Sequence, residues 1–264
     1  MQEAARKAGG ILLTYFKQNP VLSYKSAGHQ NIVTEADIKS QKIIQDFLTH
    51  NMMKKFNISK EEIGFIGEEN LYKPGKYLFA IDPLDGTSTF ASGLAFFAVS
   101  IGLFIEGELK YGVIYQPVQD EMYYAEKNKG AFRKSKIKTM QLQILKNDLK
   151  HMHFSGGLSV YEDLRKKQLK MYDELFPYFR GFISINAGCS SMCMFLENKL
   201  GLYFMGGPWI WDMAAGQIII EEAGGTMVDW HGMKFIYDLN DPDKRYPFMT
   251  CHPKNLSKIL ELMK

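Results

Sequence analysis

An apolar run that ends in a tight acidic turn constrains this chain more than any other stretch. Residues 77–81 (YLFAI) predict a buried strand, and residues 82–87 (DPLDGT) follow it directly. Pro83 fixes its own φ angle, and Gly86 allows a backbone turn that a side chain would obstruct. The turn therefore holds two carboxylates, three residues apart, at the exit of a strand.

The side chains of this turn have the chemistry of a cation site. Asp82 and Asp85 offer neighbouring carboxylate oxygens, which suit a hard cation such as Mg²⁺. The N–H groups that follow can hold an anion if a helix or a nest begins there. The same turn can also be an ordinary surface turn that binds nothing. Both interpretations are open on this segment alone.

Length and composition are those of an ordinary globular protein. The 264 residues can bury a sizeable core, and their 46% apolar and 23% charged fractions are typical of soluble domains. A net charge of +3 is too small to indicate a nucleic-acid partner. No stretch approaches the roughly 20 apolar residues of a membrane-spanning helix, and the N-terminus lacks a secretory apolar core. We therefore expect a cytoplasmic protein that contacts neither nucleic acid nor membrane.

The three cysteines agree with that location. Cys189, Cys193 and Cys251 cannot form an even disulfide framework, which suits a reducing compartment. No histidine-rich sequence accompanies them as a zinc site would require, so we interpret them as small buried residues.

Helix and strand patterns arrive in blocks rather than in strict alternation. The predicted helices cover residues 3–17, 37–53, 160–175, 190–196, 211–223 and 255–263. The predicted strands cover residues 64–69, 77–81, 96–106, 109–115, 121–126, 130–133, 151–154, 182–185, 200–204 and 226–230. This order favours a layered α/β or α+β fold over a barrel or a Rossmann unit. No G-x-G-x-x-G or P-loop motif indicates a nucleotide cofactor.

We expect residues 1–264 to form a single domain. Its N-terminal α+β half would cover about residues 1–135, and its C-terminal α/β half about residues 150–264. Because the chain begins inside its first predicted helix, further native residues can precede Met1.

Four acidic residues stand at junctions between predicted elements: Glu68, Asp82, Asp85 and Asp212. Taken singly, Glu68 can be a solvated loop residue, and Asp212 can simply favour the positive end of its helix. Several carboxylates without a set of histidines or cysteines indicate Mg²⁺ rather than zinc or copper. A water bound to such a metal ion is easily deprotonated, so the site needs no histidine base.

Ordered short motifs resemble those of the inositol monophosphatase family. They are residues 67–69 (GEE), 82–87 (DPLDGT) and 211–216 (WDMAAG), the last followed by residues 222–225 (EAGG). Residues 32–37 (IVTEAD) resemble the upstream family segment. Each motif is moderately specific, but the ordered set covers nearly the whole chain, which is identified as a member of the family.

The resemblance implies an enzyme with alternating α-β-α-β-α layers, as in inositol monophosphatases and fructose-1,6-bisphosphatases. It implies a Mg²⁺-dependent phosphomonoester hydrolase, usually a homodimer and often lithium-sensitive, with two or three ions per site. A small-molecule phosphate ester would be the substrate.

The resemblance also assigns metal ligands. Glu68, Asp82 and the carbonyl of Leu84 would hold one ion, and Asp82, Asp85 and Asp212 would hold a second. Glu68 would reach a weaker third ion through water.

Further roles follow from the same resemblance. The backbone N–H groups of Gly86 and Thr87 would bind the phosphate. Thr87, oriented by Asp37, would position the attacking water together with Glu68. Lys25 matches a family lysine near the water shell of the weaker ion, or is a solvated loop lysine.

Substrate contacts are assigned by the resemblance as well, to Asp85, Gly86, Thr87, Gly188, Ser190 and Asp212. Residues 188–191 (GCSS) match the family segment that contacts the body of the substrate. Ser190 replaces the common alanine there, and it can donate a hydrogen bond or cap the next helix.

Two positions depart from the inositol phosphatase pattern. Met205 stands where well-known members have a glutamate that contacts ring hydroxyls, and a thioether accepts such hydrogen bonds poorly. Ile185 replaces an arginine that contributes to the usual dimer contacts. Both departures point away from inositol phosphate itself, so we expect a sugar or polyol phosphate.

Two further hypotheses are open. The substrate can be fructose 1,6-bisphosphate or a nucleotide 3′-phosphate such as phosphoadenosine phosphate. The second phosphate would need Arg133, Arg165 or Arg180, and an adenine ring would need an apolar shelf. Met205, Trp209 and Trp211 can form that shelf or belong to the core.

In the other hypothesis, the protein uses this fold to bind a regulatory partner and has only weak catalysis. Against this hypothesis, every expected acidic ligand is present.

Overall fold

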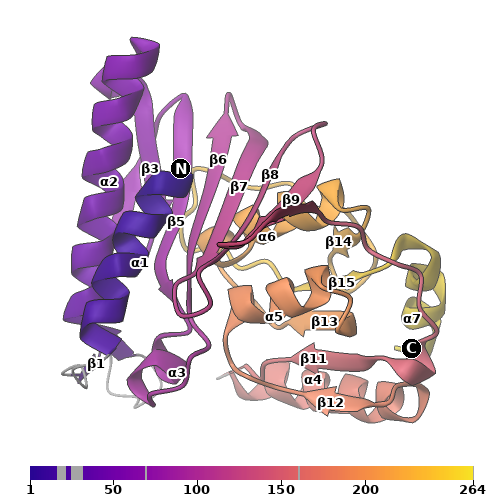
Figure 1. Ribbon diagram of the computed structural model, residues 1–264. Coiled ribbons are helices and arrows are strands. Elements are labelled where there is room, and N and C mark those ends of the chain that lie inside the picture. The colour runs from indigo at the N-terminus through magenta and orange to yellow at the C-terminus, as the bar shows by residue number, and fades with distance from the viewer. Residues whose placement is uncertain (17–21, 25–31, 69, 160, 264) are drawn as a thin grey trace.

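Helices and sheets alternate in five layers (Figure 1). The structure is a computed structural model that describes residues 1–16, 22–24, 32–68, 70–159 and 161–263. In the described part of the chain, no helix is long and apolar enough to cross a membrane. The layered fold predicted from the sequence is confirmed.

The larger sheet has eight strands in the order β10-β9-β8-β7-β6-β5-β3-β4. Its strands are β3 (Ile63–Gly67), β4 (Leu71–Lys73), β5 (Tyr77–Asp85), β6 (Ala98–Ile105), β7 (Glu108–Gln116), β8 (Glu121–Glu126), β9 (Ala131–Lys134) and β10 (Thr139–Gln141). Strands β3 and β5 are parallel, and all the other neighbours are antiparallel.

The smaller sheet has five strands in the order β12-β11-β13-β15-β14. They are β11 (His153–Gly156), β12 (Gly181–Ile183), β13 (Leu200–Met205), β14 (Thr226–Val228) and β15 (Phe248–Cys251). Strand β11 is parallel to β12 and β13, whereas β15 is antiparallel to both of its neighbours. A separate antiparallel pair joins β1 (Leu22–Tyr24) to β2 (Ile32–Thr34).

The helices form the other three layers. They are α1 (Gln2–Phe16), α2 (Glu35–Phe56), α3 (Thr87–Ala91), α4 (Glu162–Leu175), α5 (Gly188–Leu196), α6 (Ile210–Glu222) and α7 (Leu256–Leu262). Short 3₁₀ turns cover Lys60–Glu62, Leu149–His151, Phe176–Tyr178 and Pro253–Asn255. Helices α1 and α2 cover one face of the larger sheet, α5 and α6 lie between the sheets, and α4 and α7 cover the far face of the smaller sheet (Figure 1).

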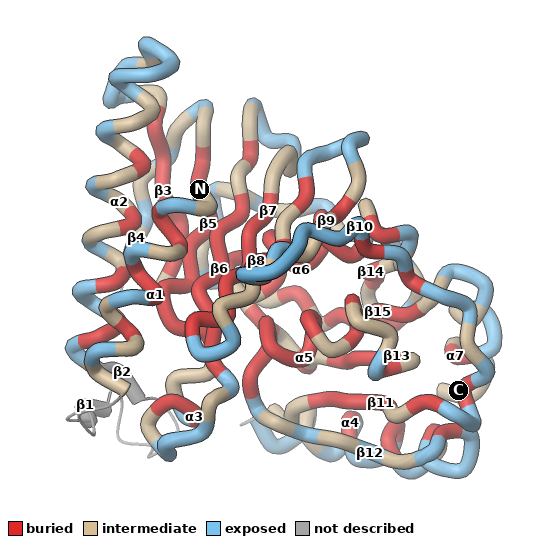
Figure 2. The backbone as a smooth tube through the Cα atoms, viewed as in Figure 1, coloured by how far each residue is buried: buried red, intermediate tan, exposed pale blue. Residues whose placement is uncertain are grey.

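Three hydrophobic clusters fill the spaces between these layers. The largest surrounds α6, whose residues from Ile210 to Ile220 are buried apart from Asp212 (Figure 2). The sheet accepts this helix closely because β6 and β7 carry glycines there. A Cβ atom at Gly112 would lie 2.6 Å from the carbonyl oxygen of Ala215. This close packing fixes the N-terminal end of α6, and with it Asp212, against the larger sheet.

Most predicted elements are present, with shifted ends. The strand predicted at residues 151–154 begins later, at His153, because residues before it form a 3₁₀ turn in which the Asp148 side chain accepts a hydrogen bond from the N–H of Lys150. The helix predicted at residues 190–196 begins earlier, at Gly188. Helix α3 and strands β1, β2, β4, β10 and β15 were not predicted.

Candidate active site

The two carboxylates of the acidic turn face one cavity because β5 contains an irregularity. Asp82 pairs with Ser100 of β6, whereas Asp85 pairs with Ala98. The two paired positions are three residues apart on β5 but only two residues apart on β6, so β5 contains one extra residue. Side chains three residues apart in a regular strand point to opposite faces. The extra residue therefore brings both side chains to the same side, as β-bulges near active sites do.

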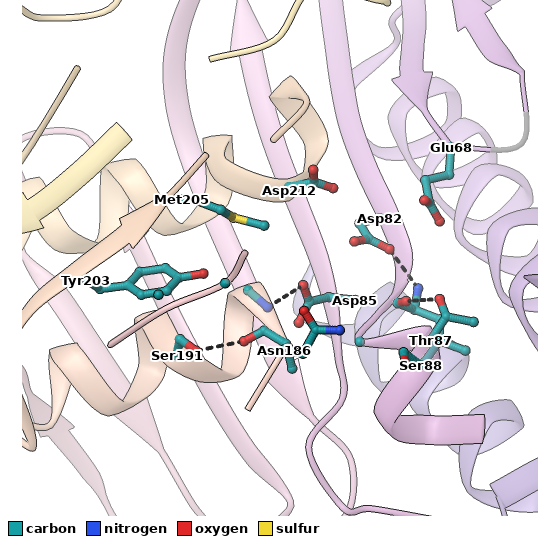
Figure 3. Close-up of a pocket in the computed structure, with 16 residues that line it drawn as sticks. Glu68, Asp82, Asp85, Thr87, Ser88, Asn186, Ser191, Tyr203, Met205 and Asp212 are labelled. Atoms are coloured by element: carbon teal, nitrogen blue, oxygen red, sulfur yellow. Dashed lines mark hydrogen bonds between the residues drawn. The ribbon is translucent and has the colours of Figure 1, made fainter. Parts of the chain in front are cut away.

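Glu68 lies beside Asp82 because β3 is parallel to β5. The register pairs Gly67 with Ile81, so the next residues of the two strands leave the sheet side by side. A Cβ atom at Gly67 would be 2.4 Å from the carbonyl oxygen of Ile81, which explains the glycine. Figure 3 shows the Glu68 carboxylate directed toward the acidic turn.

A helix begins where the acidic turn ends. Gly86 is the N-cap of α3 and has a φ of +82°, in the left-handed region that favours glycine. A Cβ atom there would also lie 2.7 Å from the carbonyl oxygen of Phe96. The first N–H groups of α3 follow this residue, which meets the condition that the sequence set for anion binding.

The Thr87 hydroxyl connects the turn to α2. It lies 3.0 Å from the carbonyl oxygen of Leu84 and 3.4 Å from Oδ1 of Asp37, and its single proton can be donated to one of them at a time. Asp37 is fully buried in the first turn of α2, whose positive end favours a carboxylate. Asp37 thus reaches the site through Thr87 and does not line the cavity itself.

Asp85 joins the two halves of the chain. Its Oδ1 accepts a hydrogen bond from the N–H of Gly188 (3.0 Å), and its Oδ2 accepts one from Cys189 (2.9 Å). These donors belong to the first turn of α5, where orphan N–H groups favour an anion. A Cβ atom at Gly188 would lie 3.0 Å from Asp85 Oδ1 and 3.3 Å from Cε of Met205, so this position suits glycine.

Asp212 both caps its helix and faces the cavity, while its role as a metal ligand stays a prediction. Its Oδ2 accepts a hydrogen bond from the N–H of Trp209 (2.8 Å), which caps α6, and the residue also lines the cavity. The start of α6 is further held by Ser100, whose hydroxyl donates to the carbonyl of Trp211 (3.1 Å).

These residues enclose a cavity of about 200 Å³ (Figure 3). Its described lining residues are Glu68, Asp82, Leu84, Asp85, Gly86, Thr87, Ser88, Gly156, Gly157, Asn186, Ala187, Gly188, Ser191, Tyr203, Met205 and Asp212. All four acidic residues singled out in the sequence are among them. Ser190 is not, and Ser191 lies there instead. Lys25 lies outside the described residues.

Ser190 needs a correction. It is buried within α5, and the N-cap of that helix is Ala187, so the alternative in which Ser190 caps the helix is wrong. The contact between Ser190 and substrate stays a prediction. The hydroxyl of Ser191 donates to the carbonyl of Ala187 (2.9 Å).

The cavity is strongly acidic. Burial raises the pKa of Asp82 well above its ordinary value, and the charges of Glu68, Asp85 and Asp212 raise it further. Burial also raises the pKa of Asp85 to about 7, although the N–H groups of Cys189 and Gly188 oppose the shift. A cation in the cavity would reverse both shifts.

The donor set fits Mg²⁺ because it consists of carboxylate and carbonyl oxygens. Among the described residues, no three acidic, histidine or cysteine side chains already converge as a metal-binding cluster. The four carboxylates instead lie around one shared cavity, at the ends of β3 and β5 and in the first turn of α6 (Figure 3). The fit thus rests on their chemistry, crowding and common cavity.

Comparison with known proteins agrees with this geometry. The model of the inositol monophosphatase family matches residues 1–259. The chain belongs to the inositol monophosphatase family. Inositol monophosphatase 3 of Solanum lycopersicum is 32% identical over 244 residues, which cover 88% of this chain and 85% of that protein. Nus factor SuhB of Pasteurella multocida is 29% identical over 231 residues, covering 87% and 83%.

A solved structure shows the same fold. The extragenic suppressor protein suhB from Bartonella henselae superposes with a TM-score of 0.86 at 27% identity, covering 100% of this chain and 96% of that chain. The inositol monophosphatase family therefore accounts for both the layers and the ordered motifs. Members of this family include phosphatases, so the fold and the acidic cavity agree with phosphatase activity.

Several residues at the site were not predicted. Asn186 and Tyr203 line the cavity, but neither stands in a motif that the sequence singles out. Ser191 belongs to the GCSS segment, in which Ser190 rather than Ser191 was assigned the substrate contact. Tyr203 is a buried strand residue, and burial and the charge of Asp85 raise its pKa well above its ordinary value. Met205, the position that departs from inositol phosphatases, lines the cavity as predicted.

The three cysteines are free and buried, as predicted.

Proposed function

We propose that this protein hydrolyses a phosphate monoester in a Mg²⁺-dependent reaction. The observation that carries the proposal is the single cavity that gathers Glu68, Asp82, Asp85 and Asp212 beside the start of α3. Four carboxylates would repel a phosphate unless cations accompany it. Membership of the inositol monophosphatase family supports the same reaction.

The metal ligands would be those named by the family resemblance. Glu68, Asp82 and the Leu84 carbonyl would hold one ion, and Asp82, Asp85 and Asp212 a second, with a third reached from Glu68 through water. The Leu84 carbonyl can serve although it accepts the Thr87 hydroxyl, because a carbonyl oxygen has two lone pairs. Bound Mg²⁺ would supply charge neutralisation and an acidified water.

The remaining residues would bind and orient the reactants. The N–H groups of Gly86 and Thr87 would hold the phosphate at the start of α3. The Thr87 hydroxyl, in contact with buried Asp37, would position the attacking water together with Glu68. The N–H groups of Gly188 and Cys189 act indirectly, by holding both oxygens of Asp85 in place.

We infer a sugar or polyol monophosphate as the substrate. No lysine or arginine is among the described residues that line the cavity, so a second phosphate would lack a cationic partner there. Arg133 is paired with Glu121 and Glu197 instead. This argues against fructose 1,6-bisphosphate.

The lining also weighs against a nucleotide 3′-phosphate. Trp211 belongs to the core and Trp209 packs against it, and neither lines the cavity, so Met205 would be the only member of the suggested apolar shelf at the site. Because Met205 replaces a glutamate, we do not expect inositol 1-phosphate to be preferred.

A regulatory role is a second candidate, favoured by the 29% identity to a protein named Nus factor SuhB. A partner-binding protein could retain the acidic cavity and turn over substrate slowly. Metal titration by calorimetry separates the two: failure to bind Mg²⁺ in the presence of phosphate would favour the regulatory role.

On the family resemblance we also propose a cytoplasmic homodimer. Sedimentation would test the oligomeric state.

A screen of phosphate esters tests the main proposal. Sugar, polyol and nucleotide phosphates would be assayed for phosphate release with Mg²⁺, with a chelator and with lithium. We expect Mg²⁺-dependent turnover of sugar or polyol phosphates, inhibited by lithium. Absence of turnover across the panel would contradict the enzyme assignment, and a preference for inositol 1-phosphate would contradict the role inferred for Met205.

A further inference from the structure

Arg245 does not line the cavity but contacts the loop that precedes α6, the helix whose first turn carries Asp212. Its guanidinium carbon is 3.1 Å from the centre of the Trp209 ring, and its Nη1 donates a hydrogen bond to the carbonyl of Gly207 (2.7 Å). The adjacent N–H of Tyr246 donates to the carbonyl of Pro208 (2.9 Å). Two consecutive residues before β15 thus hold three consecutive residues before α6.

This loop controls the Asp212 carboxylate. The N–H of Trp209 donates to Asp212 Oδ2 (2.8 Å), and the N–H of Asp212 donates to the Trp209 carbonyl (3.2 Å). The residue whose ring is covered by Arg245 is therefore the residue that fixes the carboxylate. Gly207 has a φ of +138°, which is accessible chiefly to glycine.

The surroundings of Arg245 differ from those of an ordinary half-buried arginine. Among the described residues, none of the carboxylates forms a salt bridge with it. The guanidinium contacts the rings of Trp209 and Tyr161 and the carbonyl of Gly207. Burial lowers the pKa of Arg245, while the Tyr161 side chain and then the charges of Asp212 and Asp243 favour its charged form. Planar stacking combined with a directed N–H suits arginine and not lysine.

We propose that Arg245 is a positioning residue for Asp212. By holding Gly207 and Trp209, it keeps Oδ2 of Asp212 on the helix cap and so fixes the carboxylate at the wall of the cavity. The inference rests on the proposed function, in which Asp212 is a ligand of the second ion. Residues that orient metal ligands commonly change metal affinity by about 10–100-fold when they are mutated.

The test is a titration with Mn²⁺ alone, followed by electron paramagnetic resonance of the free ion. Mn²⁺ prefers the same oxygen ligands as Mg²⁺. In Arg245→Gln the affinity of one of the Mn²⁺ sites should fall by about 10-fold or more. The affinity of Arg245→Lys for Mn²⁺ should lie between those of Arg245→Gln and wild type. Lys244→Gln is the matched control, because it removes the same charge from a neighbour that contacts Tyr246 and Asp238 instead.

A double-mutant cycle separates positioning from general damage. In an Asp212→Asn background, Arg245→Gln should cause no further loss of Mn²⁺ affinity, because the ligand that it positions is gone. Unchanged Mn²⁺ affinity in Arg245→Gln, or equal losses in both backgrounds, would overturn the inference. Circular dichroism checks that each variant is folded. If Arg245→Gln is unfolded, the Mn²⁺ affinity of Arg245→Lys is measured instead, in the wild-type and Asp212→Asn backgrounds.

A third result is distinguishable from these. If the wild-type protein binds no Mn²⁺, the proposed function itself fails and this inference falls with it.

Discussion

Single residues in this protein carry charges where burial makes them costly. Asp82 and Asp85 are 4% and 6% exposed, and both lie in a cavity with Glu68 and Asp212. Desolvation penalises the charged form of a carboxylate, and neighbouring negative charges add to that penalty. This cost is offset if cations bind in the cavity, because closely spaced carboxylates attract a cation as strongly as they repel one another.

Asp82→Asn tests this view at one atom. The asparagine oxygen can still accept the hydrogen bond from the N–H of Leu84, so the turn should persist. Losing a ligand shared by two ions should remove several kcal/mol of transition-state stabilisation, or about 10³-fold in phosphatase rate. In chelator near pH 8, the variant should melt above wild type, because asparagine avoids the free-energy cost of burying an ionisable carboxyl group among three others.

Exposed Asp173→Asn on α4 is the control and should change neither quantity. Full phosphatase activity in Asp82→Asn would exclude this residue from the site.

Met205→Glu tests the specificity argument. A carboxylate at this cavity wall could accept hydroxyl hydrogen bonds, each worth about 1.5–3 kcal/mol for a charged acceptor. We expect kcat/KM for inositol 1-phosphate to rise by about 10-fold relative to a simple sugar phosphate. Met205→Leu, which keeps the wall apolar, should leave the ratio unchanged. Equal ratios in the two variants would show that this wall does not contact the substrate body.

At the scale of elements, the site depends on how closely α6 packs on the larger sheet. In Gly112→Ala the new Cβ atom would lie 2.6 Å from the Ala215 carbonyl oxygen and 2.5 Å from Cγ2 of Ile218. Backbone cannot move aside cheaply, so we expect a loss of about 1–3 kcal/mol in the free energy of unfolding.

Gly10→Ala is the matched control for this substitution. Gly10 is exposed in α1, and nothing lies within 4 Å of its would-be Cβ atom. This variant should instead gain about 0.5–1 kcal/mol from helix propensity. Denaturant unfolding measures both variants. A neutral Gly112→Ala would show that the helix can move away from the sheet.

Local sequence patterns predicted the elements that carry the acidic residues. The apolar run before Asp82, the glycine-flanked Glu68 and the helix after Asp212 are each encoded within a few neighbouring residues, which is why they could be located. The bulge in β5 could not be, because it is defined only by pairing with β6. Strand β15 has no alternating pattern, since all four of its residues are buried.

Contacts between distant segments were also beyond local patterns. Asp85 is held by α5 from more than 100 residues away, and Ser191 of that helix, rather than Ser190, lines the cavity. Arg245 lacks any motif and acquires its neighbours only when β15 joins β13 in the smaller sheet.

At the scale of the whole molecule, the cavity lies where the two halves of the chain meet. Glu68, Asp82 and Asp85 come from the larger sheet, and Gly188 and Asp212 come from the helices between the sheets. Binding of cations by both halves should therefore stabilise the entire fold, since a ligand that binds only the native state raises its stability.

The pH dependence of stability follows from the raised pKa values. Native Asp85 has a pKa of about 7 against an ordinary value of 3.8, so the native protein binds more protons between these values. Its contribution to stability is complete below the lower value and is lost as pH rises through about 7. In chelator, the melting temperature should therefore fall between about pH 5 and pH 8.

Mg²⁺ should reverse this trend, because it competes with protons for the same oxygens. The rise in melting temperature caused by Mg²⁺ should be larger near pH 8 than near pH 5, and binding should release protons in calorimetry. An equal Mg²⁺ effect at both pH values would indicate that the ion binds elsewhere.

The most direct test of the central claim is phosphate release from a sugar or polyol monophosphate by the wild-type protein and by Asp82→Asn. The account predicts turnover with Mg²⁺ in the wild type, its loss on chelation, its return when Mg²⁺ is restored, and almost none in the variant. Turnover that survives chelation, or that is equal in the two proteins, would contradict it.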